Sequence, residues 1–186
     1  MRHCGCSENA KIYLEQFQAI LREMEQGMTC PELTDSISHN FIIQMVPHHQ
    51  AAIEMSRNIL RFTTCVPLQR IAEAIITEQT RGIRQMEEIL PCCTACLNAE
   101  AALCRYHQRF QAVIHTMFRR MGSVCGTNCL DADFMREMIP HHQGAIQMSE
   151  NALRFPICPE LQPILENIIT SQRQGVRQMQ RLLTCM

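Results

Sequence analysis

Two adjacent histidines with methionines at helical distances are the residues of this chain best suited to chemistry. They are Met45, His48, His49 and Met55. Imidazole nitrogens and thioether sulfurs are soft-to-borderline ligands that suit Cu(I) and, by extension, Ag(I). Zinc more usually takes thiolate or carboxylate in a four-ligand set. The pattern therefore predicts a soft-metal site.

The same pattern occurs again 93 residues further along the chain, at Met138, His141, His142 and Met148. Residues 13–90 align with 106–183 without an insertion, and 28 of the 50 positions from 41 to 90 are identical. This duplication predicts two pseudo-equivalent halves, residues 1–93 and 94–186. We expect them to pack together as one compact bundle with pseudo-two-fold symmetry.

Three helices are expected in each half. Apolar periodicity predicts helices over about 8–28, 38–62 and 68–90, and a second-half counterpart over about 131–155. Ser38 and Asp131 are good N-cap residues for the second helix of each half. No segment alternates at a period of two, so the chain is predicted to be all-α, an up-down bundle.

The second helix of each half carries the histidines. At 100° per residue, Met45, His48 and Met55 fall on the stripe that faces the core, with His49 on its flank. Buried imidazole nitrogens without partners are costly, so these rings need ligands or hydrogen bonds. Pro47 precedes the pair and is expected to bend the helix and re-aim the rings.

The third helix adds Met86 and Gln79 on one face, with Gly82 between them. In an antiparallel arrangement, Met24, Met28 and Met86 are expected to converge near the first histidine pair. The predicted metal ligands are Met45, His48, His49, Met55 and Met86 in the first half, and Met138, His141, His142, Met148 and Met179 in the second. Gln79 and Gln172 are expected to be outer partners of these ligands.

A plain core is the alternative interpretation of the same stripe. Methionine fills irregular gaps in cores well, and core histidines are often satisfied by amides or backbone carbonyls. The combination of paired histidines, spaced methionines, a preceding proline and exact duplication of the set favours metal over this alternative.

Cysteine is the outlier of the composition, with twelve residues of this type in 186. If the helices alternate up and down, one end of the bundle collects Cys30, Cys92, Cys93, Cys96, Cys104 and Cys158. The other end collects Cys4, Cys6, Cys65, Cys125, Cys129 and Cys185. These clusters are interpreted either as disulfides, such as Cys30–Cys92 and Cys4–Cys65, or as thiolate sites for Cu(I) or zinc.

Other functional classes are excluded or disfavoured. The net charge is −1, and the arginines are dispersed among glutamates, so neither nucleic acid nor a membrane is an expected partner. The N-terminus lacks the apolar core of a signal peptide, so a cytoplasmic location is expected. Glu-x-x-His, His-Glu-x-x-His and Gly-rich phosphate motifs are all absent, so the protein is not expected to be an enzyme.

The spacing Phe41-x-x-x-Met45-x-x-His48-His49, continued by Ala52-Ile53-x-Met55 and then Gln79 and Met86, resembles the domain-of-unknown-function 305 family. Both copies show it, over about 38–90 and 131–183. The resemblance implies a ferritin-like four-helix bundle. Through its CopM-like copper-resistance members, it also implies non-enzymatic binding of Cu(I) and Ag(I) by histidine and methionine.

The sequence thus predicts a metal-binding protein that sequesters or hands over a soft ion, most simply Cu(I). A cysteine-stapled structural protein and a thiol redox protein remain alternatives. Metal ions are the expected partners, and the sequence leaves open whether copies of the chain form a homo-oligomer.

Overall fold

A computed structural model describes residues 7–124 and 126–186. Within these ranges the chain forms helices and no strands, as predicted. The helices are α1 (Glu8–Thr29), α2 (Ile37–Leu60), α3 (Val66–Cys93), α4 (Glu100–Gly122), α5 (Leu130–Ala152) and α6 (Leu161–Leu183). The predicted all-α bundle of two three-helix repeats is therefore confirmed.

The predicted capping residues of the two histidine-bearing helices are not the ones observed. Helix α2 is capped by Ser36, whose Oγ accepts the backbone N–H of His39 at 3.2 Å, rather than by Ser38. Extended backbone at Ser36 ends the preceding loop two residues earlier than expected. Helix α5 begins after Cys129 without a side-chain cap, and Asp131 instead lies in its first turn, where its charge complements the helix dipole.

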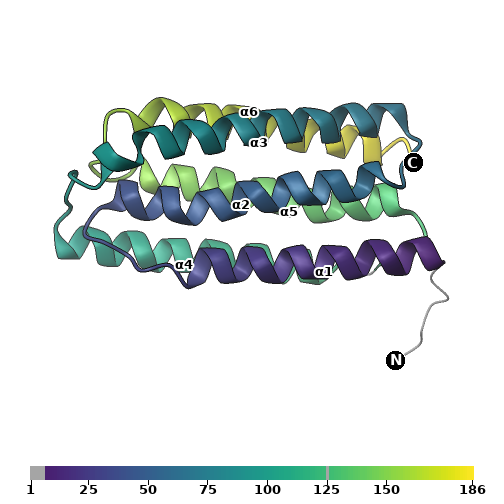
Figure 1. The fold of residues 1–186 in the computed structure, drawn as a ribbon, viewed down its shortest axis with the longest axis horizontal. Helices are drawn as coiled ribbons and strands as arrows, with labels where there is room; N and C mark the ends of the chain where they lie inside the picture. Colours follow the sequence, from purple (N-terminus) through teal and green to yellow (C-terminus); the bar gives the residue numbers. More distant parts are fainter. Residues whose placement is uncertain (1–6, 125) are drawn as a thin grey trace.

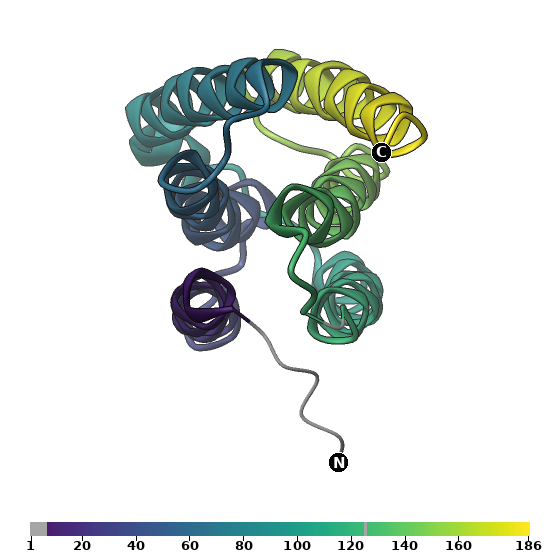
Figure 2. The same cartoon turned by 90° about the vertical axis from the view of Figure 1, so that its right-hand side faces the viewer.

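The helices are stacked in three layers of two (Figure 1). Helices α3 and α6 form one outer layer, α2 and α5 the middle layer, and α1 and α4 the other outer layer. Viewed from the end, each repeat forms its own column of three helices, and the columns meet along α2–α5 and α3–α6 (Figure 2). These four helices form a four-helix bundle, and α1 and α4 together cover one side of it.

Equivalent contacts in the two repeats show the pseudo-two-fold symmetry directly. The Asn58 side-chain amide donates to the carbonyl oxygen of Tyr13 at 3.0 Å. Asn151, 93 residues later, donates to the carbonyl oxygen of Tyr106 at the same distance. Each bond ties the first helix of a repeat to the end of its second helix, so both repeats fix their histidine-bearing helix in the same way.

Methionine supplies much of the core between these helices. Eleven methionines are buried, and all but Met24 and Met117, at 2%, have at most 1% of their surface exposed. They are Met24, Met28, Met45, Met55, Met86, Met117, Met121, Met135, Met138, Met148 and Met179. Thioether side chains are flexible and polarisable. This core can therefore adjust its packing more readily than a core of branched aliphatic side chains.

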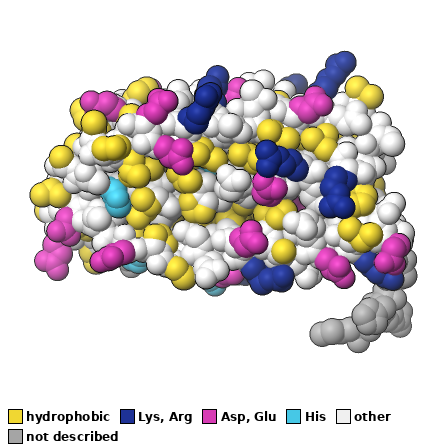
Figure 3. Space-filling view, viewed as in Figure 1, with side chains coloured by type: hydrophobic (Ala, Val, Ile, Leu, Met, Phe, Trp, Pro, Cys, Tyr) yellow, Lys and Arg dark blue, Asp and Glu magenta, His cyan; other side chains and the backbone are white. Residues whose placement is uncertain are grey.

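On the face shown in Figure 3, arginines are interspersed with acidic side chains, so no large patch of a single charge forms there. None of the helices in the described ranges is long and apolar enough to span a membrane.

A buried acid breaks the symmetry of the two repeats. Tyr13 on α1 donates its hydroxyl to the Glu137 carboxyl on α5 at 2.6 Å, across the boundary between repeats. Burial raises the pKa of Glu137 to about 8, although the Tyr13 hydrogen bond acts in the opposite direction. Repeat one carries Gln44 at the equivalent position, and its amide donates to the carbonyl oxygen of Met28 at 3.0 Å. The first repeat therefore fills this core position with a side chain that does not titrate.

The variant Glu137→Gln tests this difference. Because the folded-state pKa of Glu137 lies above its ordinary value of 4.5, the stability it contributes is complete below that pH and is lost as the pH rises toward 8. We expect the unfolding free energy of wild type relative to Glu137→Gln to fall from about pH 5 to 8, with a slope approaching about 1.4 kcal/mol per pH unit. Urea unfolding of the metal-free proteins measures it. A difference that stays flat across this window contradicts the assignment.

Candidate metal centre

Four buried histidines meet where the two repeats join. His48 on α2 and His141 on α5 stack across the boundary, with ring centroids 3.6 Å apart and ring planes inclined by 26°. His49 and His142 flank them, each with its centroid 6.0 Å from that of its chain neighbour. All four side chains are at most 2% exposed. The two pairs predicted from the sequence, one per repeat, thus form a continuous row of imidazoles.

The ring nitrogens in this row are short of partners. In the described part of the chain, the buried Nδ1 atoms of all four histidines have no hydrogen-bond partner. The Nε2 atom of His141 donates to the carbonyl oxygen of His48 at 3.1 Å, since a carbonyl can only accept. That bond fixes the tautomer of His141 and leaves its Nδ1 with a free lone pair. Nδ1 is therefore the atom that His141 could offer to a metal. The Nδ1 atoms of His49 and His142 are likewise free, and His48 has both ring nitrogens free, among the residues that the structure describes.

Two glycines give the outer rings their room. A Cβ atom added to Gly82 on α3 would lie 3.1 Å from Cδ2 and Nε2 of His49. A Cβ added to Gly175 on α6 would lie 2.8 Å and 2.9 Å from the same atoms of His142. Glycine lowers helix stability by about 1 kcal/mol relative to alanine. At these two positions the missing side chain lets an imidazole lie directly against the third helix.

Burial keeps the four rings neutral. It lowers the pKa of His49 to about 3 and that of His141 to about 4. Burial and then the neighbouring imidazoles lower the pKa of His48 and of His142 as well. Since a metal binds neutral imidazole, these ligands need not lose a proton at neutral pH.

Three buried methionines on three different helices lie level with one another, about one helical turn before His48. Helices α1 and α3 both run antiparallel to α2 (Figure 1). Gly82 lies beside His49, so Met86, four residues or about 6 Å further along α3, lies level with Met45 on α2. Met28 lies at the same level, because its carbonyl oxygen accepts the amide of Gln44. These three methionines are at most 1% exposed and belong to one core cluster.

The second repeat provides the equivalent set, Met121, Met138 and Met179, each fully buried. The predicted ligand set lacks Met28 and Met121, although the sequence carries methionine at both equivalent positions of the first helix. Met117, another omission, packs its sulfur against Gly144, two residues after the histidine pair. Methionine recurs at equivalent positions of α1 and α4, and this recurrence in the sequence could have identified these residues.

The expected convergence of all predicted thioethers is only partial. Met45 and Met55 are ten residues apart, or about 15 Å along the axis of α2. Met138 and Met148 have the same spacing on α5. One ion beside His48 can therefore take Met45 but not both, and the assignment of Met55 and Met148 as ligands stays a prediction.

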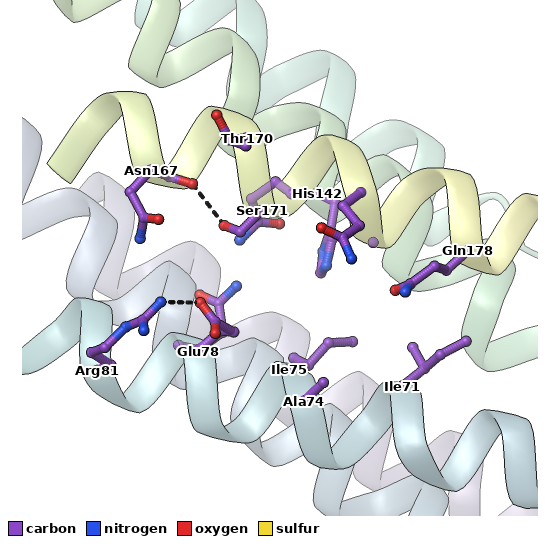
Figure 4. A pocket seen from close by; sticks show the side chains of 14 residues that line it. Ile71, Ala74, Ile75, Glu78, Arg81, His142, Asn167, Thr170, Ser171 and Gln178 are labelled. Atoms are coloured by element: carbon purple, nitrogen blue, oxygen red, sulfur yellow. Dashed lines mark hydrogen bonds and ion pairs between the residues drawn. The ribbon is translucent and has the colours of Figure 1, made fainter. Parts of the chain in front are cut away.

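A groove between α3 and α6 leads to the histidine row. It has a volume of about 330 Å³ and is lined by His142, Gly175 and two glutamines, Gln79 and Gln172. Figure 4 shows His142 directed into it, with polar side chains of α6 on one wall and the Glu78–Arg81 ion pair on the other. The buried Oε1 atoms of Gln79 and Gln172 have no partner in the described ranges. The groove is thus lined by an imidazole and by two glutamines whose amide oxygens have no partner in the described part of the chain.

The cysteines lie at the two ends of the bundle, as predicted for those that the structure describes. Cys4, Cys6 and Cys125 lie outside the described residues. The nine others are free thiols, including Cys30 and Cys92, so the disulfide interpretation does not hold for that pair. No group of three or more His, Cys, Asp or Glu side chains within the described ranges is arranged to hold a metal ion. A four-ligand zinc cluster is accordingly not present among them.

The fold and this site define the chain as a tandem-repeat helical bundle with a buried histidine–methionine interior. The sequence profile of the domain of unknown function (DUF305) matches residues 14–90 and 107–183. The chain therefore belongs to the DUF305 family, with two copies of the domain.

Solved structures agree with this assignment. A DUF305 fragment from Deinococcus radiodurans superposes with a TM-score of 0.60 at 23% identity, covering 84% of this chain and all of the fragment. CopM in a silver-bound form superposes with a TM-score of 0.60 at 27% identity, covering 81% of this chain and 97% of CopM. A second silver-bound form of CopM gives 0.58 and 26%, with 79% and 95% covered. No curated protein matches the chain.

Substituting the two glycines tests how the outer rings are held. We expect Gly175→Ala to lower the free energy of unfolding by about 1–3 kcal/mol, because the new methyl group overpacks the His142 ring. Gly82→Ala should cost less, since its Cβ would stand farther from His49. Thermal unfolding measures both.

Gly122→Ala is the matched control, because nothing lies within 4 Å of a Cβ added there. We expect it to leave the melting temperature unchanged or slightly raised. Equal effects of the three substitutions would show that ring contact is not what the glycines provide.

Proposed function

We propose that the protein binds a soft monovalent ion, Cu(I) or Ag(I), at the histidine row and sequesters the ion or hands it on. The observation that carries the proposal is the set of four buried Nδ1 atoms without hydrogen-bond partners at the junction of the repeats. Buried polar groups in native proteins nearly always have partners, and a bound ion is one way to supply them.

The proposed ligands form two equivalent sets, one on each side of the central ring stack. The first combines His48 and His49 with Met28, Met45 and Met86. The second combines His141 and His142 with Met121, Met138 and Met179. The stacked rings of His48 and His141 bring the two sets together, so the sites adjoin one another rather than lying in separate halves.

The charge of the ligands favours a monovalent ion. Imidazole and thioether are both neutral, so an ion bound by them keeps its whole charge inside a core. Because the cost of burying a charge grows with its square, a divalent ion pays about four times the penalty of a monovalent one. Soft donors select Cu(I) among the abundant biological metals, and Ag(I) shares its preferences.

Access to the site is provided by the groove between α3 and α6. An ion entering there first meets the free amide oxygens of Gln79 and Gln172 and then His142. Similarity to CopM, whose structures contain silver, supports the same class of ion. Without a nucleophile or an acid–base pair at the row, binding and transfer of the ion are the whole of the proposed activity.

Anaerobic titration with Cu(I) and with Ag(I), after alkylation of the accessible thiols, tests the proposal. We expect the variant His48→Ala/His49→Ala/His141→Ala/His142→Ala to lose about two equivalents of bound ion relative to wild type, because each set loses its imidazoles. In wild type, the ¹⁵N resonances of the four Nδ1 atoms should shift on adding Ag(I).

His107→Ala/His115→Ala is the control, because both side chains are exposed on α4. It should bind as wild type does. Unchanged stoichiometry in the four-histidine variant, together with unshifted Nδ1 resonances in wild type, would refute the proposal; the second readout needs no variant to fold.

A further inference from the structure

A pair of buried thiols joins the two repeats at one end of the bundle, away from the histidine row. Cys93 is the last residue of α3, and Cys158 lies in the link between α5 and α6. Their side chains are 0% and 1% exposed, and each thiol affects the pKa of the other. The pair has no symmetric counterpart, because the residues equivalent to Cys158 and Cys93 are Cys65 and Met186.

Polar contacts fix the backbone on both sides of this pair. Ser36 donates its hydroxyl to the carbonyl oxygen of Cys93 at 2.6 Å. The backbone N–H of Cys158 donates to the hydroxyl of Ser38 at 2.8 Å. Both serines are fully buried at the start of α2. Two segments 65 residues apart in sequence, each carrying a buried thiol, are thus anchored to one helix end.

The Asn98 side chain strengthens the same junction. Its amide donates to the carbonyl oxygen of Pro156, and its oxygen accepts the backbone N–H of Ile37, both at 2.8 Å. The links that follow α3 and α5 are therefore held against the start of α2. A ligand bound between the thiols would find them already positioned, which reduces the ordering that binding requires.

The surroundings of the pair include a proton acceptor. Glu160 accepts the thiol proton of Cys158 at 2.8 Å. Burial raises the pKa of both Cys93 and Cys158, so both thiols are protonated in the metal-free protein. Cys92 and Cys96 lie near enough to Cys93 to raise its pKa further by charge repulsion. A cation between the two sulfurs would remove that repulsion and stabilise the thiolates.

We propose that Cys93 and Cys158 form a two-thiolate site for a monovalent soft ion, Cu(I) or Ag(I), at the junction of the repeats. Zinc requires about four ligands, and although Glu160 contacts Cys158, no group of three or more His, Cys, Asp or Glu side chains in the described ranges is arranged to hold a metal ion. Cu(I) and Ag(I) are stable with two sulfur ligands in a linear arrangement.

The binding step is an exchange of protons for a metal ion. One Cu(I) adds to two thiols to give a Cu(I) bis-thiolate of net charge −1, and two protons leave. Glu160 is placed to accept the proton of Cys158 first, and both protons pass finally to solvent. No electron is transferred, so neither an oxidant nor a reductant is needed.

This site uses none of the ligands of the histidine row, so either proposal can fail without the other. Cys93 is seven residues beyond Met86, on the same buried face of α3 and about 10 Å along its axis. An ion held by the thiols therefore lies near one end of the first methionine set.

The experiment is an anaerobic Cu(I) titration of the reduced full chain in competition with a chromophoric Cu(I) chelator. We expect Cys93→Ser/Cys158→Ser to bind one equivalent less than wild type and to lose the corresponding thiolate-to-metal charge-transfer absorption. Cys30→Ser/Cys104→Ser is the control, since it removes two exposed thiols from the same end of the bundle and should leave that equivalent in place.

Proton release supplies a readout that needs no folded Cys93/Cys158 variant. In the Cys30→Ser/Cys104→Ser protein, this equivalent of Cu(I) should release about two protons at pH 7, whereas ions bound by imidazole and thioether release none. Unchanged stoichiometry in Cys93→Ser/Cys158→Ser would overturn the proposal. So would an equivalent that binds without proton release, or a mass 2 Da lower that shows the reduced pair closing to a disulfide instead.

Discussion

Four imidazole rings are buried in a core that offers few hydrogen-bond partners to their nitrogens, and the rest of the structure depends on this placement. Two of the rings stack at 3.6 Å on the boundary between repeats, and two lie against glycines of the outer helices. Such a placement is unfavourable unless the ring nitrogens find partners. It lowers the pKa values of the histidines and requires glycine at positions 82 and 175. The main features of the site thus follow from the free-energy cost of burying imidazole nitrogens without hydrogen-bond partners.

The antiparallel course of the helices turns the duplicated sequence into a joint site. In each repeat, α1 and α3 run against α2 or its counterpart, so methionines far apart in sequence reach the same level. The two-fold relation then brings His48 of one repeat against His141 of the other. A single repeat would contain one histidine pair with one side uncovered. The second repeat supplies that cover and also a second set of buried histidines and methionines.

Much of this could be predicted from the sequence, because duplication and helical periodicity are local patterns. The six helices, their up-down order and the inward face of the His–Met stripe all follow from spacing. The stacking of His48 on His141 could not be predicted, because it depends on how α2 and α5 pack across the repeat boundary. The start of α2 also differed from the prediction because of a contact between distant segments. Ser38 does not cap the helix, since its hydroxyl accepts the backbone N–H of Cys158, 120 residues away. The role of Gly82 also became clear only when its neighbour proved to be a ring.

The short connection between the repeats has a consequence for assembly. Helix α3 ends at Cys93 and α4 begins at Glu100, so six residues tether the two columns of helices. A short tether gives linked partners an effective concentration on the order of millimolar. Two free copies of one repeat would instead have to find each other, and dilution would separate them. Covalent linkage thus makes formation of the shared interior independent of the concentration of the protein. It also frees the two copies to diverge, as Gln44 and Glu137 have done, without disturbing the interface that they share.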